Sequence, residues 1–181
     1  MSKVFLTIFC IDKRFDYLSA KFFESTNDNN YYLLTTAGSS LCLGYEKYPK
    51  NDCDCGMTNE DDMNLLKDSI VKNIKIASSL DNLEEVYLLN HQDCGAIKAY
   101  LNFTNYPKNV GDDNTSEIKI NTELLLYAKE YILKNISKIQ DVKLALIDIN
   151  GTVAEYDLKY CSWKLKYRGP GNDPNGLWYG L

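Results

Sequence analysis

The sequence lacks long apolar runs and basic clusters. No window approaches the roughly 20 apolar residues that a membrane span requires, and the apolar stretch near the amino terminus is shorter than the core of a signal peptide. No run of lysine and arginine offers a surface to phosphate backbones or anionic lipids, and the formal net charge is -5. We therefore expect an intracellular, cytoplasmic protein that binds neither nucleic acid nor a membrane.

Histidine is scarce, whereas cysteine is not. The 181 residues contain a single histidine, His91, and six cysteines. In the absence of a secretion signal, this number of cysteines favours reduced thiols or metal ligands over a disulfide framework. The length suits one domain, and we predict a domain over residues 1–166 with a C-terminal tail over residues 167–181, where glycine and proline interrupt any periodicity.

The order of apolar patterns predicts an α/β fold. Short apolar runs typical of buried strands occur at residues 4–9, 31–36, 86–89 and 142–149. Helical spacing follows them at residues 16–24 and 62–80, from Gly95 onward, and at residues 120–132. This alternation implies right-handed crossovers and a mostly parallel central sheet of four strands with helices on both faces. Asn150-Gly151 is a hairpin signal, so residues 152–156 should form an antiparallel edge strand.

Two short segments carry residue types that bind metals. Residues 10–14, Cys-Ile-Asp-Lys-Arg, follow the first predicted strand, and residues 91–95, His-Gln-Asp-Cys-Gly, follow the third. Ligands of an open parallel sheet bind outside the carboxyl ends of its strands, where the strand order reverses. Catalytic zinc sites use three protein ligands, often Cys and His, and leave a fourth position open. Cys10, His91 and Cys94 supply that set.

Each of these residues also has a simpler interpretation. A lone buried histidine is more often structural than metal-binding, but Cys94 lies three residues after His91 and Cys10 ends another strand. Asp12 and Arg14 could form an ordinary surface ion pair. In an extended segment, however, both point to the same side as Cys10. Their spacing from Cys10 therefore favours a role for Asp12 and Arg14 beside the metal over a plain surface pair.

The two motifs together, Cys-x-Asp-x-Arg and His-x-x-Cys-Gly, resemble the signature of the β-class carbonic anhydrases. Ala37-Gly38, after the second predicted strand, also resembles the Asn-Ala-Gly turn of that family, and the similarity covers about residues 4–156 in element order. The resemblance implies a zinc enzyme that reversibly hydrates carbon dioxide to bicarbonate and a proton, and that forms a homodimer or a higher homo-oligomer. It implies metal ligation by Cys10, His91 and Cys94, catalytic roles for Asp12 and Arg14, and substrate contacts at Gly38 and Gly95.

Several features depart from the pattern of that family. Its members usually carry a helical segment before the first strand, whereas only nine residues precede Cys10 here. Ser39 and Ser40 differ from the usual surroundings of the glycine turn. An acidic stretch with Cys53 and Cys55 has no counterpart; a second metal site or a redox pair is possible there, although reduced thiols in a loop are favoured. The two remaining cysteines are expected to be small core residues: Cys42 and Cys161.

Other functions are compatible with the same motifs. Carbonyl sulfide or carbon disulfide could be hydrolysed at the same zinc site, and the chain could be a non-catalytic scaffold or binding protein that zinc stabilises. The presence of Asp12 and Arg14 argues against the scaffold, since a structural zinc site has no need of them. If His91 is a ligand, the chain has no other imidazole to carry protons to solvent. We therefore expect turnover to depend on buffer concentration.

Overall fold

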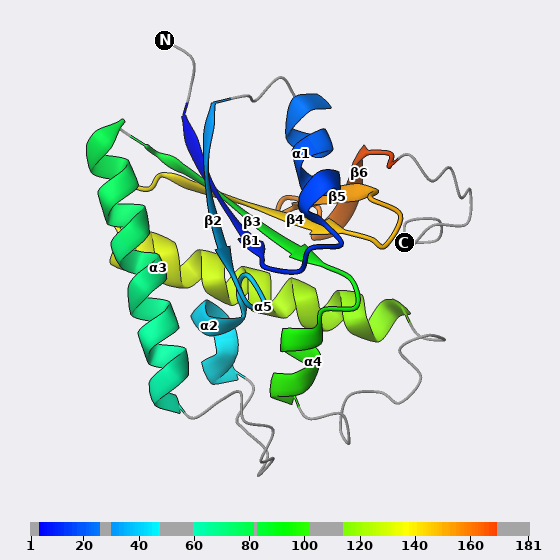
Figure 1. Ribbon diagram of the computed structural model, residues 1–181, viewed down its shortest axis with the longest axis horizontal. Coiled ribbons are helices and arrows are strands. Elements are labelled where there is room, and N and C mark those ends of the chain that lie inside the picture. Colours follow the sequence, from blue (N-terminus) through cyan, green and yellow to red (C-terminus); the bar gives the residue numbers. More distant parts are fainter. Residues whose placement is uncertain (1–3, 26–29, 48–59, 82, 102–113, 170–181) are drawn as a thin grey trace.

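The computed structural model describes residues 4–25, 30–47, 60–81, 83–101 and 114–169. Within these residues the chain forms a six-stranded sheet of order β2-β1-β3-β4-β5-β6 (Figure 1). The strands are β1 (Phe5–Cys10), β2 (Tyr31–Thr36), β3 (Glu85–His91), β4 (Asp141–Ile147), β5 (Val153–Asp157) and β6 (Ser162–Tyr167). The helices are α1 (Asp16–Ser25), α2 (Leu41–Gly44), the 3-10 helix η1 (Tyr45–Lys47), α3 (Glu60–Leu80), α4 (Gly95–Leu101) and α5 (Asn114–Asn135).

The four strands β2, β1, β3 and β4 are parallel, as the alternation of strands and helices predicts. β1 lies beside both β2 and β3, and Phe9 pairs with Leu89 across the β1–β3 ladder. His91, the last residue of β3, pairs with Ile147, the last residue of β4. The carboxyl ends of these strands therefore meet at one edge of the sheet.

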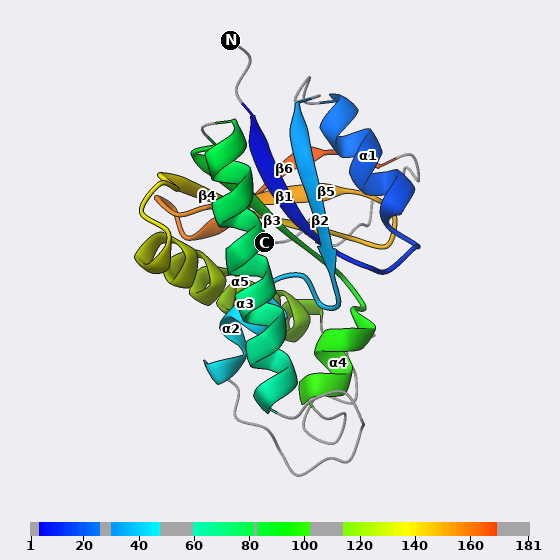
Figure 2. The ribbon, with the colours of Figure 1, turned by 60° about the vertical axis from the view of Figure 1, so that its left-hand side comes forward.

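Helices cover both faces of the sheet, which confirms the predicted layers. Alternate residues of β1 enter different cores: Leu6 and Ile8 pack with helices α2, α3, α4 and α5, whereas Phe5 and Phe9 pack on the side of α1. Figures 1 and 2 show α1 on the opposite side of the sheet from α3 and α5. Among the helices that the structure describes, none combines the length and the apolarity that crossing a membrane would need.

The antiparallel part of the sheet is larger than predicted. β5 pairs antiparallel with β4, as expected, but it is not the edge strand, because β6 pairs antiparallel with β5 and lies at the edge. The pattern Ser-Trp-Lys-Leu-Lys-Tyr of β6 is half exposed and gives a weaker signal than a buried strand. β6 ends at Tyr167, where the predicted tail begins; residues 170–181 of that tail lie outside the described residues, and the proposed division at residue 166 stays a prediction.

Candidate metal centre

Cys10, His91 and Cys94 lie together at the carboxyl edge of the sheet. Cys10 ends β1, His91 ends the adjacent strand β3, and Cys94 directly precedes α4. Their ligand atoms all lie within 4.8 Å of one another, and the two sulfur atoms are 3.9 Å apart. All three residues are buried. The predicted ligand set is thus brought to one point by the pairing of β1 with β3.

The contacts of His91 indicate which tautomer its neutral imidazole adopts. Its Nδ1 lies 2.7 Å from the backbone carbonyl oxygen of Gln92, which can only accept, so Nδ1 carries the proton. Nε2 therefore presents a lone pair, and this buried atom has no hydrogen-bond partner among the described residues. Leaving such an atom unpaired costs about 1–3 kcal/mol. The Phe15 ring, with its centroid 4.3 Å from that of His91, helps to fix the orientation of the imidazole.

The two thiols share one hydrogen bond and differ in acidity. The hydrogen bond from Cys94, with smaller contributions from the neighbouring His91 and from the Gly38 N–H at 3.4 Å, lowers the pKa of Cys10 to about 4. The same bond and burial raise the pKa of Cys94. One proton is thus lost readily, and the second is held between the sulfurs. A coordinated cation would displace that second proton, since thiols that bind a metal are deprotonated.

The donor set fits a thiophilic divalent cation. Thiolate and imidazole ligands are typical of zinc and of other soft or borderline transition metals. The unpartnered Nε2 of His91 gains a partner when a cation binds, and the hydrogen bond from Nδ1 to Gln92 is the outer contact that usually orients such a ligand. The described part of the chain therefore holds a cluster of three residues that could bind a metal ion.

Asp12 and Arg14 form the predicted pair beside this cluster. Arg14 Nε donates to both carboxylate oxygens of Asp12 at 3.0 and 3.1 Å, and Nη2 donates to Oδ2 at 2.6 Å. These bonds hold the pKa of Asp12 at about 2, so the carboxylate is ionised near neutral pH and can only accept hydrogen bonds. Its Oδ2 lies 3.9 Å from His91 Nε2. The ionised Asp12 carboxylate thus lies close to the His91 nitrogen that could bind a metal.

Arg14 has a second carboxylate partner that the sequence motif does not predict. Its Nη1 donates to Asp93 Oδ2 at 2.9 Å, and its Nη2 donates to the Asp93 carbonyl oxygen at 3.0 Å. Asp93 has a left-handed φ of 59° and also pairs with Lys98 of α4. The Asp93 N–H donates to Glu117 Oε1 on α5 at 2.7 Å. Asp93 lies inside the second motif, but Glu117 is one of several acidic residues on a long helix, and nothing in the sequence distinguishes it.

A buried polar chain supports the end of β3 on its other side. Ser40 Oγ donates to Asn90 Oδ1 at 2.8 Å, and Asn90 Nδ2 donates to Asn121 Oδ1 at 2.9 Å. Ser39 Oγ donates to the carbonyl oxygen of Ile8 at 3.1 Å. The two serines that depart from the family pattern therefore connect the glycine turn to β1 and to the residue before His91.

The two glycines expected to contact substrate lie next to the two candidate ligand cysteines. Gly38 has a φ of 73°, and a Cβ there would lie 2.9 Å from the Cβ of Leu41. Because its N–H points to Cys10, this turn supports the thiol directly. Gly95 follows Cys94 as the first residue of α4, and a Cβ there would meet open space. Their contacts with substrate stay predictions.

The other cysteines contribute nothing to the cluster in the part of the chain that is described. Cys42 is fully buried in the helical core, as predicted, and burial raises its pKa to about 12. The prediction for Cys161 is wrong, because this residue is exposed in the turn between β5 and β6 and has a left-handed φ of 49°. Cys53 and Cys55 lie outside the described residues.

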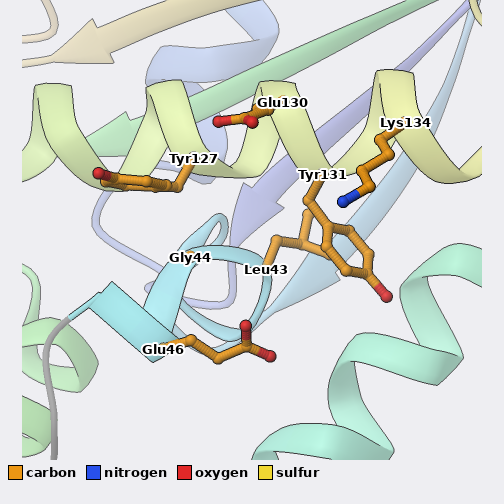
Figure 3. Close-up of a pocket in the computed structure, with 7 residues that line it drawn as sticks. All are labelled: Leu43, Gly44, Glu46, Tyr127, Glu130, Tyr131 and Lys134. Atoms are coloured by element: carbon orange, nitrogen blue, oxygen red, sulfur yellow. The ribbon is translucent and has the colours of Figure 1, made fainter.

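A separate groove lies between α5 and the segment formed by α2 and η1 (Figure 3). Its volume is about 320 Å³, and its lining residues are Leu43, Gly44, Glu46, Tyr127, Glu130, Tyr131 and Lys134. Glu46 pairs with Lys67, whose side chain is buried between the Tyr45 and Tyr131 rings. None of the three metal-binding candidates lines this groove, so it is distinct from the cluster.

Comparisons with known proteins find similar structures but no similar sequences. No protein-family model and no curated protein matches the chain. The carbonic anhydrase from Streptococcus mutans is 18% identical over 84% of this chain and 81% of its own, with a TM-score of 0.43. The β-carbonic anhydrase CafA of Aspergillus fumigatus is 12% identical over 87% and 76%, with a TM-score of 0.41. The apo form of a carbon disulfide hydrolase is 14% identical over 95% and 80%, with a TM-score of 0.40.

Proposed function

We propose that the chain is a zinc-dependent carbonic anhydrase that reversibly hydrates carbon dioxide to bicarbonate and a proton. One observation carries the proposal: the unpartnered Nε2 of His91 lies with two thiol sulfurs beside an ionised carboxylate that an arginine holds. Three protein ligands leave one zinc position free for chemistry, whereas structural zinc sites are closed by four. The residues around the cluster thus favour a catalytic site over a purely structural one.

Each residue of the site has a defined task in this reaction. Zinc, when bound, would lower the pKa of a water molecule and so supply hydroxide at moderate pH; the pKa reaches about 7 in favourable sites, and two thiolates should lower it less. Cys10 and Cys94 would hold the ion as thiolates and offset its formal charge, and His91 would hold it through the Nε2 lone pair. Asp12 accepts the remaining hydrogen of the nucleophile and so orients its lone pair toward carbon. Arg14 keeps Asp12 ionised and in place.

The proton released by hydration must leave through the solvent. Asp12 is a poor proton carrier near neutral pH, because its pKa is about 2. His91 carries its proton on Nδ1, where the Gln92 carbonyl holds it. These residues therefore orient the nucleophile and bind the ion but do not accept the product proton.

The first test combines metal content with stopped-flow hydration of carbon dioxide at pH 7 and pH 8.5. We expect one zinc per chain in the wild type, loss of both zinc and activity in Cys94→Ser, and retained zinc in Asp12→Ala with activity about 10- to 100-fold lower. Asp157→Ala is the matched control, since Asp157 also pairs with a cation, Lys164, but on the β5–β6 hairpin. This control should retain both zinc and activity.

Other results would point to the alternatives. Zinc without hydration of carbon dioxide would reject the proposal; turnover of carbonyl sulfide or carbon disulfide would then identify a hydrolase, and inertness toward all three gases a scaffold. A wild-type protein that binds no zinc would reject the site itself. Equal activity of Asp12→Ala and wild type would remove the assigned role of Asp12.

A further inference from the structure

Arg14 donates hydrogen bonds to two residues, Asp12 and Asp93. Only Asp12 belongs to the Cys-x-Asp-x-Arg motif that contains Arg14. Asp12 accepts from Nε and Nη2, while the Asp93 carboxylate and carbonyl accept from Nη1 and Nη2. Arg14 and Asp93 lie 79 residues apart in the chain. The guanidinium therefore connects the segment that follows Cys10 at the end of β1 to the turn after β3 that contains Cys94.

The contacts with Asp93 are needed to fix the orientation of Arg14, because the Arg14 side chain is exposed. Its side chain is 49% exposed, and an exposed ion pair between two side chains holds them weakly. With Asp12 alone the guanidinium would have one partner only two residues away. The Asp93 carboxylate and carbonyl add two acceptors in fixed directions, which restrict the plane of the guanidinium.

Asp93 is itself fixed from α5. Its N–H donates to Glu117 Oε1 at 2.7 Å, and Glu117 is only 3% exposed although it carries a carboxyl group. Burying a carboxyl group away from water is costly, so its position needs a reason. α5 is packed into the helical core through Leu124 and Ile132, both fully buried. Glu117 thus provides a rigid anchor for a turn whose φ is otherwise unfavourable.

We propose that Glu117 is a positioning residue of the metal centre: it fixes the Asp93 peptide, and through Asp93 it holds Arg14 and the Asp12 carboxylate. The catalytic consequence rests on the proposed function, whereas the positioning of Arg14 is a property of the chain alone. A purely structural role for Glu117 would change the stability of the fold without changing how Arg14 is held.

The first experiment observes Arg14 directly. The chain contains two arginines, Arg14 and Arg168, so a protein labelled with ¹⁵N-arginine gives two Nε–H signals, which Arg168→Lys assigns. In the full-length protein, hydrogen exchange at Arg14 Nε should become about tenfold faster in Glu117→Leu, the factor that about 1.4 kcal/mol represents. Glu117→Gln retains an acceptor oxygen and should stay within about twofold of the wild type.

Two further variants keep this experiment decisive. Ile132→Val removes one methyl group from the core side of α5 and should lower stability without changing exchange at Arg14. If Glu117→Leu does not fold, Glu117→Asp, which withdraws the carboxylate by one methylene, should show the same acceleration. Exchange at Arg14 that is unchanged in the folded variant, or equally accelerated in Ile132→Val, would overturn the proposal.

A double-mutant cycle tests the route through Arg14. If Glu117 acts through Arg14, kcat for hydration should fall about tenfold in Glu117→Leu and no further when Glu117→Leu is added to Arg14→Ala, because residues of one network are not additive. Multiplicative losses would mean that Glu117 acts by another route. A wild type that hydrates no carbon dioxide would reject the proposed function, and exchange at Arg14 would still decide the positioning role.

Discussion

The cysteine thiols of this chain differ in acidity because their surroundings differ. Cys10 accepts hydrogen bonds from Cys94 and from the Gly38 N–H, and its pKa falls to about 4. Cys42 is surrounded by apolar side chains, and burial raises its pKa to about 12. Cys161 lies exposed in a turn. Only the first of these environments prepares a thiolate for binding a metal.

This contrast predicts the order in which the thiols react with iodoacetamide. Because burial raises the pKa of Cys42 to about 12, this thiol stays protonated at pH 8, and it is also shielded from the reagent. Peptide mapping by mass spectrometry should therefore find that Cys161 is modified in the native protein while Cys42 is not. Both should react in urea, which serves as the control. Native labelling of Cys42 at the rate of Cys161 would contradict its placement in the core.

The sequence predicts the centre of the site better than its surroundings. Cys10, His91 and Cys94 end or follow neighbouring strands, so their meeting depends only on strand order. Asp93 and Glu117 meet because α5 packs at one particular rotation against the turn after β3. Such rotations depend on the whole core, and a single sequence does not encode them in a local motif.

The β4–β5 hairpin has a tight turn with a strict requirement for glycine. Asp148 N–H donates to the Thr152 carbonyl at 2.9 Å, which leaves residues 149–151 as a three-residue loop. Gly151 takes the left-handed position with a φ of 80°, as is usual in such loops. A Cβ at this glycine would lie 2.7 Å from Leu18 Cδ2 on α1. The turn thus joins the edge of the sheet to the helix on its face.

Gly151→Ala should consequently destabilise the fold by about 1–3 kcal/mol, because alanine is strained at positive φ and meets Leu18. Gly95→Ala is the matched control: its φ is not positive, and a Cβ would meet open space, so stability should be unchanged or about 0.4–1 kcal/mol higher. Urea denaturation followed by circular dichroism measures both. Equal stability of the two variants would show that the turn tolerates a side chain.

Elements with strong periodicity are predicted from the sequence, whereas short ones are not. The pattern of residues 31–36 predicts β2 to the residue, and the spacing of residues 62–80 identifies most of α3. The four-residue helix α2 has too few turns to show a period and depends on packing against α5. β6 pairs only with β5 and is largely exposed. Its lysines alternate with Trp163 and Leu165, so the sequence shows no continuous apolar run that would predict a buried strand.

The site lies at the point where the strand order of the sheet reverses. From β1 the connection through α1 leads to β2 on one side, while β3 and β4 lie on the other side. The segments after β1 and β3 therefore diverge at the carboxyl edge, which is where open parallel sheets bind ligands. Cys10 and His91 are the last residues of these two strands.

The composition of the whole chain limits how the product proton can leave. His91 is the single histidine of the 181 residues, and it is buried with its Nδ1 proton held by Gln92. No other imidazole can carry protons near neutral pH. We therefore expect kcat for hydration to rise with the concentration of imidazole or phosphate buffer, as stopped-flow measurements at constant ionic strength and pH would show.

The same measurement contains its own control. Proton transfer to buffer follows the conversion of carbon dioxide to bicarbonate, so it limits kcat but does not enter kcat/KM, which covers only the steps up to that conversion. The value of kcat/KM should thus stay constant while kcat rises and then levels off. A kcat that is independent of buffer over a wide range of concentrations would contradict the expectation that buffer accepts the product proton.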